Sequence, residues 1–183
     1  MKKILSLSIF ILVLVTGCST MTAKEKTNKR IELDTMATKA VDSLKQKEAD
    51  LQGKLDNSLA YGVANMKVTK VPMVGAGGGE GVLVIKKTQE RIYFTVSRFD
   101  IGGGWGARGY KALMVFNDQK ILDEWKDGKW IFEAGAEASA GSAAAQGSSA
   151  GENKGFTMHI LPEAGASATA TARVIKVQIN KDL

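Results

Sequence analysis

Two segments of the chain alternate strictly between alanine and another residue, and this pattern limits what the chain can fold into. Alanine takes every second position from Ala164 to Ala172, and the same alternation runs from Ala134 to Ala140. A two-residue period is the period of a β-strand, whose successive side chains point to opposite faces. A face made only of alanine lets another backbone approach closely. We therefore expect two neighbouring strands, under a helix or across a tightly curved sheet.

Other strand-like runs are separated by glycine. Residues 81–85 and 113–116 are apolar at consecutive positions, which is typical of strands covered on both faces. The predicted sheet contains these two runs and other strand-like segments. The predicted strands are 81–87, 91–99, 110–116, 130–140, and two within 155–179 around Pro162. The low-complexity stretch 140–151 is predicted to be a hairpin loop.

Two glycine clusters, 75–81 and 102–106, lie beside these runs. Glycine in or beside a strand marks a bend, a bulge or a close approach of backbones, so the favoured interpretation is that both clusters curl the sheet. The alternative is a flexible rim that presents Trp105, Arg108 and Lys111. An aromatic ring beside cations suits a membrane interface, where the ring lies at headgroup level.

Apolar residues recur at helical spacing before the predicted sheet. The stripe comprises Leu33, Met36, Ala40, Leu44, Leu51, Leu55 and Leu59, and glycine at 53 and Asp-Asn at 56–57 are expected to divide it into two helices. Such a stripe can dock on the sheet or lie on a membrane. The mixed charges between the apolar positions favour docking on the sheet. A short helix within 117–126 is expected to turn Ile121, Leu122 and Trp125 to the core. The predicted fold class is α+β: N-terminal amphipathic helices on a mainly antiparallel, strongly curved sheet.

The first residues have the layout of a lipoprotein signal. Lys2 and Lys3 precede an apolar run over 4–15 that is too short to span a membrane, and Gly17 leads directly into Cys18. We expect cleavage before Cys18 and attachment of acyl chains such as palmitate to it, which would hold the chain at a membrane. Ser19 favours the outer membrane, facing the periplasm. The expected organisation is a signal peptide at 1–17, a lipidated flexible tether at 18–30, and one domain at 31–183.

The net charge indicates which binding partners are compatible with the chain, and the cysteine content shows whether an intrachain disulfide is possible. Loss of 1–17 removes two lysines and lowers the formal net charge from +6 to +4 (6 − 2). That charge is compatible with an anionic membrane surface but too small to indicate nucleic acid, and export makes a nucleic-acid partner unexpected. The one cysteine leaves no intrachain disulfide.

Motif matches do not support catalysis. Residues 104–109 match GxGxxG, but a strand-like run follows where a dinucleotide site needs a helix. Residues 147–151 match GxSxG inside low-complexity sequence, without the strand–turn–helix setting of a nucleophile. His159 is the only histidine, so no His/Cys cluster for a metal exists. We expect no enzyme activity, no cofactor and no metal.

A set of ordered motifs resembles the SYLF lipid-binding domain family, from about Ser58 to the end. The motifs are Ala60-Tyr61-Gly62-Val63, Thr69-Lys70-Val71, the 75–81 run into Val82-Leu83-Val84, Gly102, Gly106-Ala107 before 113–116, Gly128, Trp130, 133–138, Lys154-Gly155 and Gly165. The resemblance implies a compact, mainly β domain with N-terminal helices that binds phospholipid. Arg108 stands where the family often has glutamine, and Asn65-Met66-Lys67 replaces a phenylalanine-proline pair. Eukaryotic ligands of the family are phosphoinositides and, for some, actin, so here a bacterial lipid or a protein is expected.

The function expected from these features is that of a lipid-anchored envelope protein that binds anionic phospholipid at a membrane surface. In this prediction Trp105 inserts into the membrane, while cationic side chains attract the headgroups: Lys67, Lys70, Arg108 and Lys111. The alternative is an envelope scaffold lipoprotein that binds another protein and has no headgroup specificity.

Overall fold

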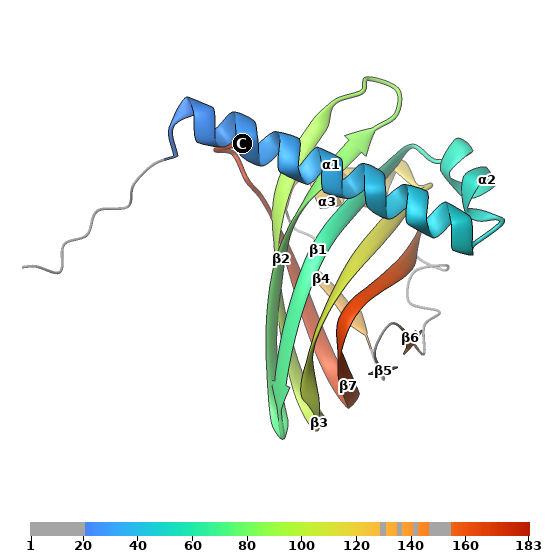
Figure 1. Cartoon of the computed structure of the whole chain (residues 1–183). Helices are drawn as coiled ribbons and strands as arrows, with labels where there is room; N and C mark the ends of the chain where they lie inside the picture. Colours follow the sequence, from blue (N-terminus) through green and yellow to red (C-terminus); the bar gives the residue numbers. More distant parts are fainter. Residues whose placement is uncertain (1–20, 129–130, 135–136, 141–142, 147–154) are drawn as a thin grey trace, which may run out of the picture.

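The computed structural model describes residues 21–128, 131–134, 137–140, 143–146 and 155–183. It confirms an α+β fold with a long N-terminal helix on a strongly curved antiparallel sheet (Figure 1). The predicted signal peptide, Cys18, and residues 141–142 and 147–151 of the predicted loop lie outside the described residues, whereas residues 143–146 of that loop form a short strand.

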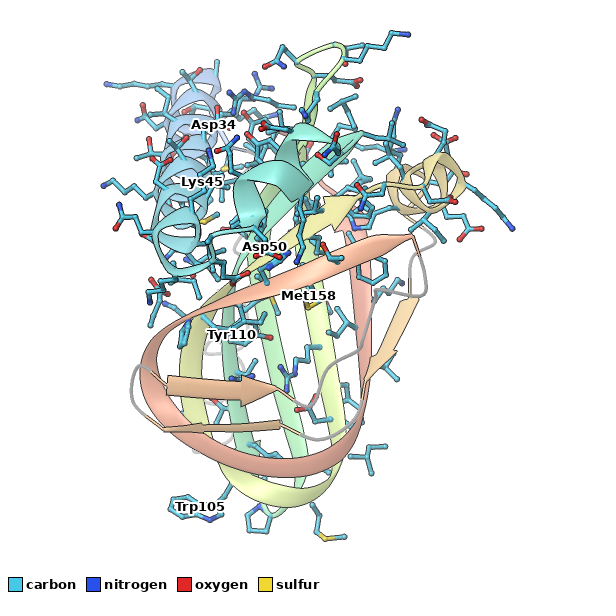
Figure 2. All side chains as sticks on the ribbon, turned by 90° about the vertical axis from the view of Figure 1, so that its right-hand side faces the viewer. Asp34, Lys45, Asp50, Trp105, Tyr110 and Met158 are labelled. Atoms are coloured by element: carbon cyan, nitrogen blue, oxygen red, sulfur yellow. The ribbon has the colours of Figure 1, made fainter. Side chains whose placement is uncertain are left out.

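Three long strands and a fourth that follows them form the wall of the sheet. Strands β1 (Ala60–Val71) and β2 (Met73–Ile85) make a hairpin. Strand β3 (Arg91–Phe116) flanks both sides of this hairpin, because its first half pairs with β2 and its second half pairs with β1. Strand β7 (Phe156–Ile179) pairs with β3 along its whole length. β3 and β7 therefore form two nested U-shaped ribbons around the hairpin tip (Figure 2).

The bend of β3 lies in the second glycine cluster, as expected for a cluster that curls the sheet. Gly102, Gly104 and Gly106 have φ angles of 132°, 143° and 136°. Glycine adopts positive φ angles readily, whereas other residues adopt them only at a cost in conformational energy. The runs 91–99 and 110–116, expected as separate strands, are joined by this bend into one strand.

The first glycine cluster lies in β2, where backbones approach closely. A Cβ at Gly79 would lie 2.2 Å from the backbone oxygen of Asn65, and a Cβ at Gly81 would lie 2.2 Å from that of Val63. The glycine cluster therefore lies within β2, which begins at Met73 and not at the expected residue 81. Its partner β1 was not predicted from the apolar pattern.

Short strands complete the sheet beside β7. Strand β4 (Ile131–Ala134) and strand β5 (Glu137–Ala140) both pair with β7, and β6 (Ala143–Gln146) pairs with β5. The pairing of 137–140 with 166–169 confirms that the two alternating segments are neighbours. The two strands expected around Pro162 are one strand, with a register irregularity at Gly109/Tyr110 opposite this proline. Such an irregularity suits a residue that has no amide hydrogen for the ladder.

Helix α1 (Ala23–Lys47) lies across the convex face of the sheet, which confirms docking on the sheet. Its buried side chains, including Leu33 and Leu44, pack against Val63, Val82 and Leu113. Residues 23–30, expected in the tether, instead form its first turns. The reason is a capping box: Thr22 accepts a hydrogen bond from the Glu25 amide, and the Glu25 carboxylate accepts one from the Thr22 amide.

The break between the helices lies earlier than expected. Helix α2 (Leu51–Asp56) contains Gly53, which was predicted to interrupt it. The chain instead leaves α1 at Glu48, where the backbone is extended and the carboxylate lies 2.5 Å from Nδ1 of His159 on β7. The end of α1 therefore coincides with this tertiary contact. The predicted break at 56–57 coincides with the end of α2.

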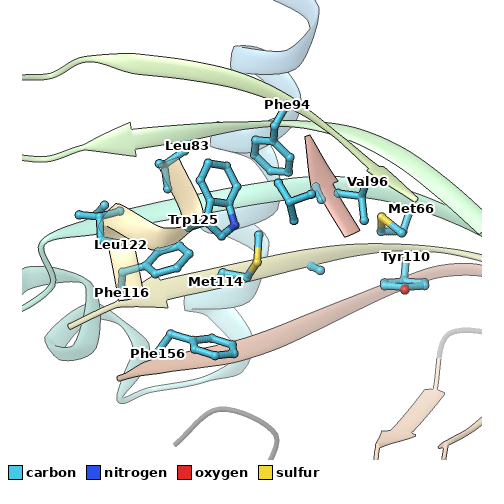
Figure 3. Packing of buried hydrophobic residues seen from close by; sticks show 14 of the residues in the cluster. Met66, Leu83, Phe94, Val96, Tyr110, Met114, Phe116, Leu122, Trp125 and Phe156 are labelled. Carbon is cyan, nitrogen blue, oxygen red and sulfur yellow. The ribbon is translucent and has the colours of Figure 1, made fainter. Parts of the chain in front are cut away.

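A second core fills the concave side of the sheet. Helix α3 (Gln119–Lys126) covers it, and Leu122 and Trp125 are buried as expected. The Trp125 ring meets the Phe94 ring edge-on, with centroids 4.6 Å apart (Figure 3). Leu83 and Met114 face this core, while their neighbours Val82 and Leu113 face α1. The runs 81–85 and 113–116 are thus covered on both faces, as predicted.

Candidate functional site

Exposed apolar side chains gather at the end of the sheet where the β1–β2 hairpin turns and β3 bends. Figure 2 shows Trp105 at this end, away from α1, and its side chain is 73% exposed. Seven of the ten large apolar side chains exposed in the described part of the chain belong to this set, which we call the apolar end: Val71, Met73, Val74, Phe99, Ile101, Trp105 and Val174.

The strand register arranges the convex face of this end in rows. The first row is Val71, Val74 and Ile101, which are paired in turn across β1, β2 and β3. The second row continues onto β7 as Thr69, Ala76, Phe99 and Val174. Both rows are exposed to solvent. Six of their side chains carry no charge or hydroxyl, so this face of the end is almost entirely apolar.

A row with two lysines borders the apolar rows. It consists of Lys67, Gly78, Ser97 and Lys176, again paired strand to strand, and both lysines are exposed. The next row is polar and comprises Asn65, Glu80, Thr95 and Gln178. Beyond it, Val63, Val82 and Tyr93 are buried beneath α1. Polarity therefore changes in order along the face, from apolar to cationic to neutral polar and acidic, and then to the packed helix.

Ion pairs hold α1 to the sheet next to the polar row. Lys29 pairs with Glu80 at 2.7 Å, and the hydrogen bond from Lys29 to Glu80 raises the pKa of Lys29. Asp34 pairs with Arg91 at 2.9 Å and accepts a hydrogen bond from the Tyr93 hydroxyl. Burial, followed by the Asp34 charge, raises the pKa of Tyr93. These partly exposed contacts add to the buried packing of the apolar stripe of α1 against the sheet.

A charged cluster lies on the concave side behind the apolar end. Lys70, Arg98, Asp100 and Arg108 are all buried, together with Tyr110. Arg98 donates hydrogen bonds to both carboxylate oxygens of Asp100, at 2.9 and 2.7 Å, and to the Tyr110 hydroxyl at 2.8 Å. Burial opposes the charge on Arg98, but the hydrogen bond to Asp100 and the nearby Tyr110 leave its pKa above the usual value. The guanidinium of Arg98 is therefore held in its charged form inside the protein, beside the Asp100 carboxyl group.

The structure separates the five predicted lipid-binding residues. Trp105 is exposed at the apolar end and Lys67 is exposed in the row that borders it, whereas Lys70 and Arg108 point to the concave interior. Strand alternation is the cause, since residues an odd number of positions apart face opposite sides. Lys111 is on the convex side, where it forms an ion pair with Glu163. Their roles in lipid binding remain predictions.

Sequence reasoning missed most of the apolar end. Val71, Val74, Phe99, Ile101 and Val174 lie in three different parts of the sequence, and only the register brings them together. Lys176 was missed for the same reason. The signal available in the sequence was local: apolar residues alternating with small or polar ones on each side of a glycine cluster.

The GxSxG match at 147–151 lies outside the described residues, and the other motif residues lie in regular strands. The GxGxxG match at 104–109 lies inside β3, where no helix begins. His159 is buried between Glu48 and the Thr157 hydroxyl and so joins α1 to β7. Within the described ranges, no group of His, Cys, Asp and Glu side chains could hold a metal ion. No described helix is both long enough and apolar enough to span a bilayer.

Comparison with known proteins shows a distant similarity. No family model matches the chain. The chain is similar to the beta cell expansion factor A of Aeromonas veronii, with 26% identity over 162 residues. That alignment covers 88% of this chain and 60% of the relative, so the chain spans about three fifths of the relative's length.

Proposed function

We propose that this protein is a lipid-anchored, non-catalytic envelope protein of the SYLF type that binds the surface of an anionic phospholipid membrane through its apolar end. The observation that carries the proposal is the order of the rows: two exposed apolar rows bordered by a row with two lysines. Monomeric soluble proteins rarely expose contiguous apolar patches without a binding role.

The spacing of the rows matches the layers of a membrane interface. Residues rise by about 3.3 Å along a strand, so successive rows on one face are about 7 Å apart. Amphipathic elements at an interface bury their apolar face by roughly 5–10 Å. With Phe99 and Ile101 at that depth, Lys67 and Lys176 lie at the level of the phosphates. Each lysine contributes about 1 kcal/mol near a charged surface.

Trp105 suits the same arrangement. Its side chain is the most exposed of the apolar end, and tryptophan favours the boundary where its ring is buried and its indole N–H can still find a partner. In this proposal Trp105 and Lys67 keep the roles predicted from sequence, Lys176 is added, and the buried Lys70 and Arg108 do not contact the membrane surface.

The predicted lipid on Cys18 complements this surface. Acyl chains on the mature N-terminus would keep the domain beside a bilayer, so a weak surface contact would be occupied most of the time. The resemblance of the sequence to lipid-binding SYLF domains agrees with such a surface. The proposed location is the periplasmic face of the outer membrane.

The test compares two isoleucines with nearly equal exposure in a full-length chain carrying Cys18→Ser. Ile101 is 58% exposed at the apolar end, and Ile31 is 59% exposed on α1. Ile101→Asp should weaken binding to phosphatidylglycerol vesicles by at least about tenfold, because it loses apolar burial and adds a charge at the membrane. Ile31→Asp should bind as the parent does.

Vesicle flotation and circular dichroism measure binding and folding in parallel. Equal vesicle binding by the Ile101→Asp variant and the parent would contradict the proposal. A folded parent that ignores vesicles but captures a stoichiometric envelope protein would favour the scaffold alternative.

A further inference from the structure

The amine of Lys70 is buried on the concave side without a partner in the described part of the chain. The side chain is 4% exposed, and its Nζ makes no hydrogen bond. Lys70 pairs with Gly75 on β2 and with Gly106 on β3, and Gly75 pairs in turn with Asp100. Buried polar atoms of this kind are exceptions in folded proteins, and such an atom often binds an ion or a water molecule.

The nearby carboxylate is directed to another cation. Both oxygens of Asp100 accept hydrogen bonds from Arg98, at 2.9 and 2.7 Å, and within the described residues no ion pair joins Asp100 to Lys70. Burying an ammonium group without an acceptor is costly, and an accompanying anion removes that cost. The surroundings of Lys70 therefore favour an anion as a ligand.

The strands beside Lys70 present backbone instead of side chains. A Cβ at Gly75 would lie 3.2 Å from the Cγ of Lys70 and 3.3 Å from the Cβ of Asp100. Gly106, the other backbone partner of Lys70, also has no side chain, and its φ of 136° disfavours any replacement. The Arg108 guanidinium lies 4.5 Å from the centre of the Tyr110 ring in the same cluster.

We propose that Lys70 is the centre of an interior anion site that takes a phosphate group. Amine and guanidinium groups are the usual protein partners of phosphate, the lysine acting as a point charge. A phosphate offers several acceptor oxygens to the three donors of the ammonium group, which a halide does not. The phosphate can be a free ion or the headgroup of a lipid. This site is on the concave side, so it does not depend on the membrane contact of the convex rows.

The test measures the melting temperature of the full-length Cys18→Ser chain with two probes. One probe is inorganic phosphate, and the other is a short-chain phosphatidic acid below its micelle concentration, each against sodium chloride of equal ionic strength. A probe at about 100 times its Kd should raise the melting temperature by about 5–10 °C for a chain of this size. A response to both probes identifies free phosphate as sufficient, and a response to phosphatidic acid alone identifies a lipid headgroup.

Variants of Lys70, with a control variant at another lysine, show whether the response to the probes depends on the interior site. Lys70→Met should melt higher than the parent without probe, because it removes a buried charge that has no acceptor, and should lose the response to both probes. Lys70→Arg should keep a response, and so should Lys87→Met, which removes the same charge from an exposed position outside both proposed binding surfaces. The proposal is overturned by an unchanged melting temperature with both probes, by an equal response in Lys70→Met, or by a Lys70→Met chain less stable than the parent.

Discussion

At the scale of single residues, the protein tolerates or rejects a side chain according to which face of a strand it occupies. Lys67 and Lys70 are three positions apart on β1, yet one is exposed in the lysine row and the other is buried among charges. The glycines of β2 and β3 differ in the same way. Gly79 is pressed against the β1 backbone, whereas a Cβ at Gly103 would meet nothing within 4 Å.

These two glycines give a matched pair for measuring close backbone approach. Gly79→Ala should destabilise the fold by about 2 kcal/mol or more, because its Cβ cannot enter without moving β1. Gly103→Ala should change the free energy of unfolding by less than about 1 kcal/mol. Urea denaturation followed by circular dichroism gives both values. A smaller loss for Gly79→Ala than for Gly103→Ala would contradict the tight pairing of β1 and β2.

At the scale of elements, the helices cover surfaces that the strands cannot cover themselves. Helix α1 closes the convex face, and α3 closes the open end of the concave core with Trp125, which is fully buried among Phe94, Phe116 and Leu122. The helical spacing of the apolar residues predicted both helices, although not the first turns of α1, which begin at the capping box of Thr22 and Glu25. The end of α1 was predicted less well: it lies at Glu48, which contacts His159, a residue far away in the sequence.

Removal of the Trp125 side chain should show how much α3 contributes to the stability of the fold. Trp125→Ala should lower the free energy of unfolding by about 3–5 kcal/mol, the usual cost of truncating a large buried aromatic residue. Ile121, on the same helix, is only partly buried, and Ile121→Ala should cost clearly less. Differential scanning calorimetry should place the two variants in this order. Similar losses for both would mean that α3 is not seated through Trp125.

At the scale of the whole molecule, the arrangement gives one end a polarity gradient. The apolar end lies opposite the helices, with the lysine row between it and the polar row that borders α1. A gradient of this kind can orient the protein on a surface, because apolar burial and headgroup attraction act in the same direction at successive depths.

The electrostatic part of this gradient can be tested separately from the apolar part. Lys67→Gln/Lys176→Gln removes about 2 kcal/mol of attraction, which corresponds to about 30-fold weaker binding to anionic vesicles. The control Lys87→Gln/Lys120→Gln removes the same net charge from exposed sites elsewhere and should weaken binding much less. Titration at low salt measures both, and raised salt should narrow the difference. Equal losses would show that net charge, and not the lysine row, is responsible.

The sequence alone determined the elements whose signals are local. A two-residue period identifies strands, a helical stripe identifies α1, and glycine runs indicate where a sheet bends, because each pattern reflects backbone geometry within a few residues. The sequence did not determine which side chains would meet. The apolar end joins three distant segments, and the burial of Lys70 depends on register, where a shift of one residue exchanges the faces. Only the tertiary structure decided these, because long-range strand pairing sets the register, and no local signal encodes it.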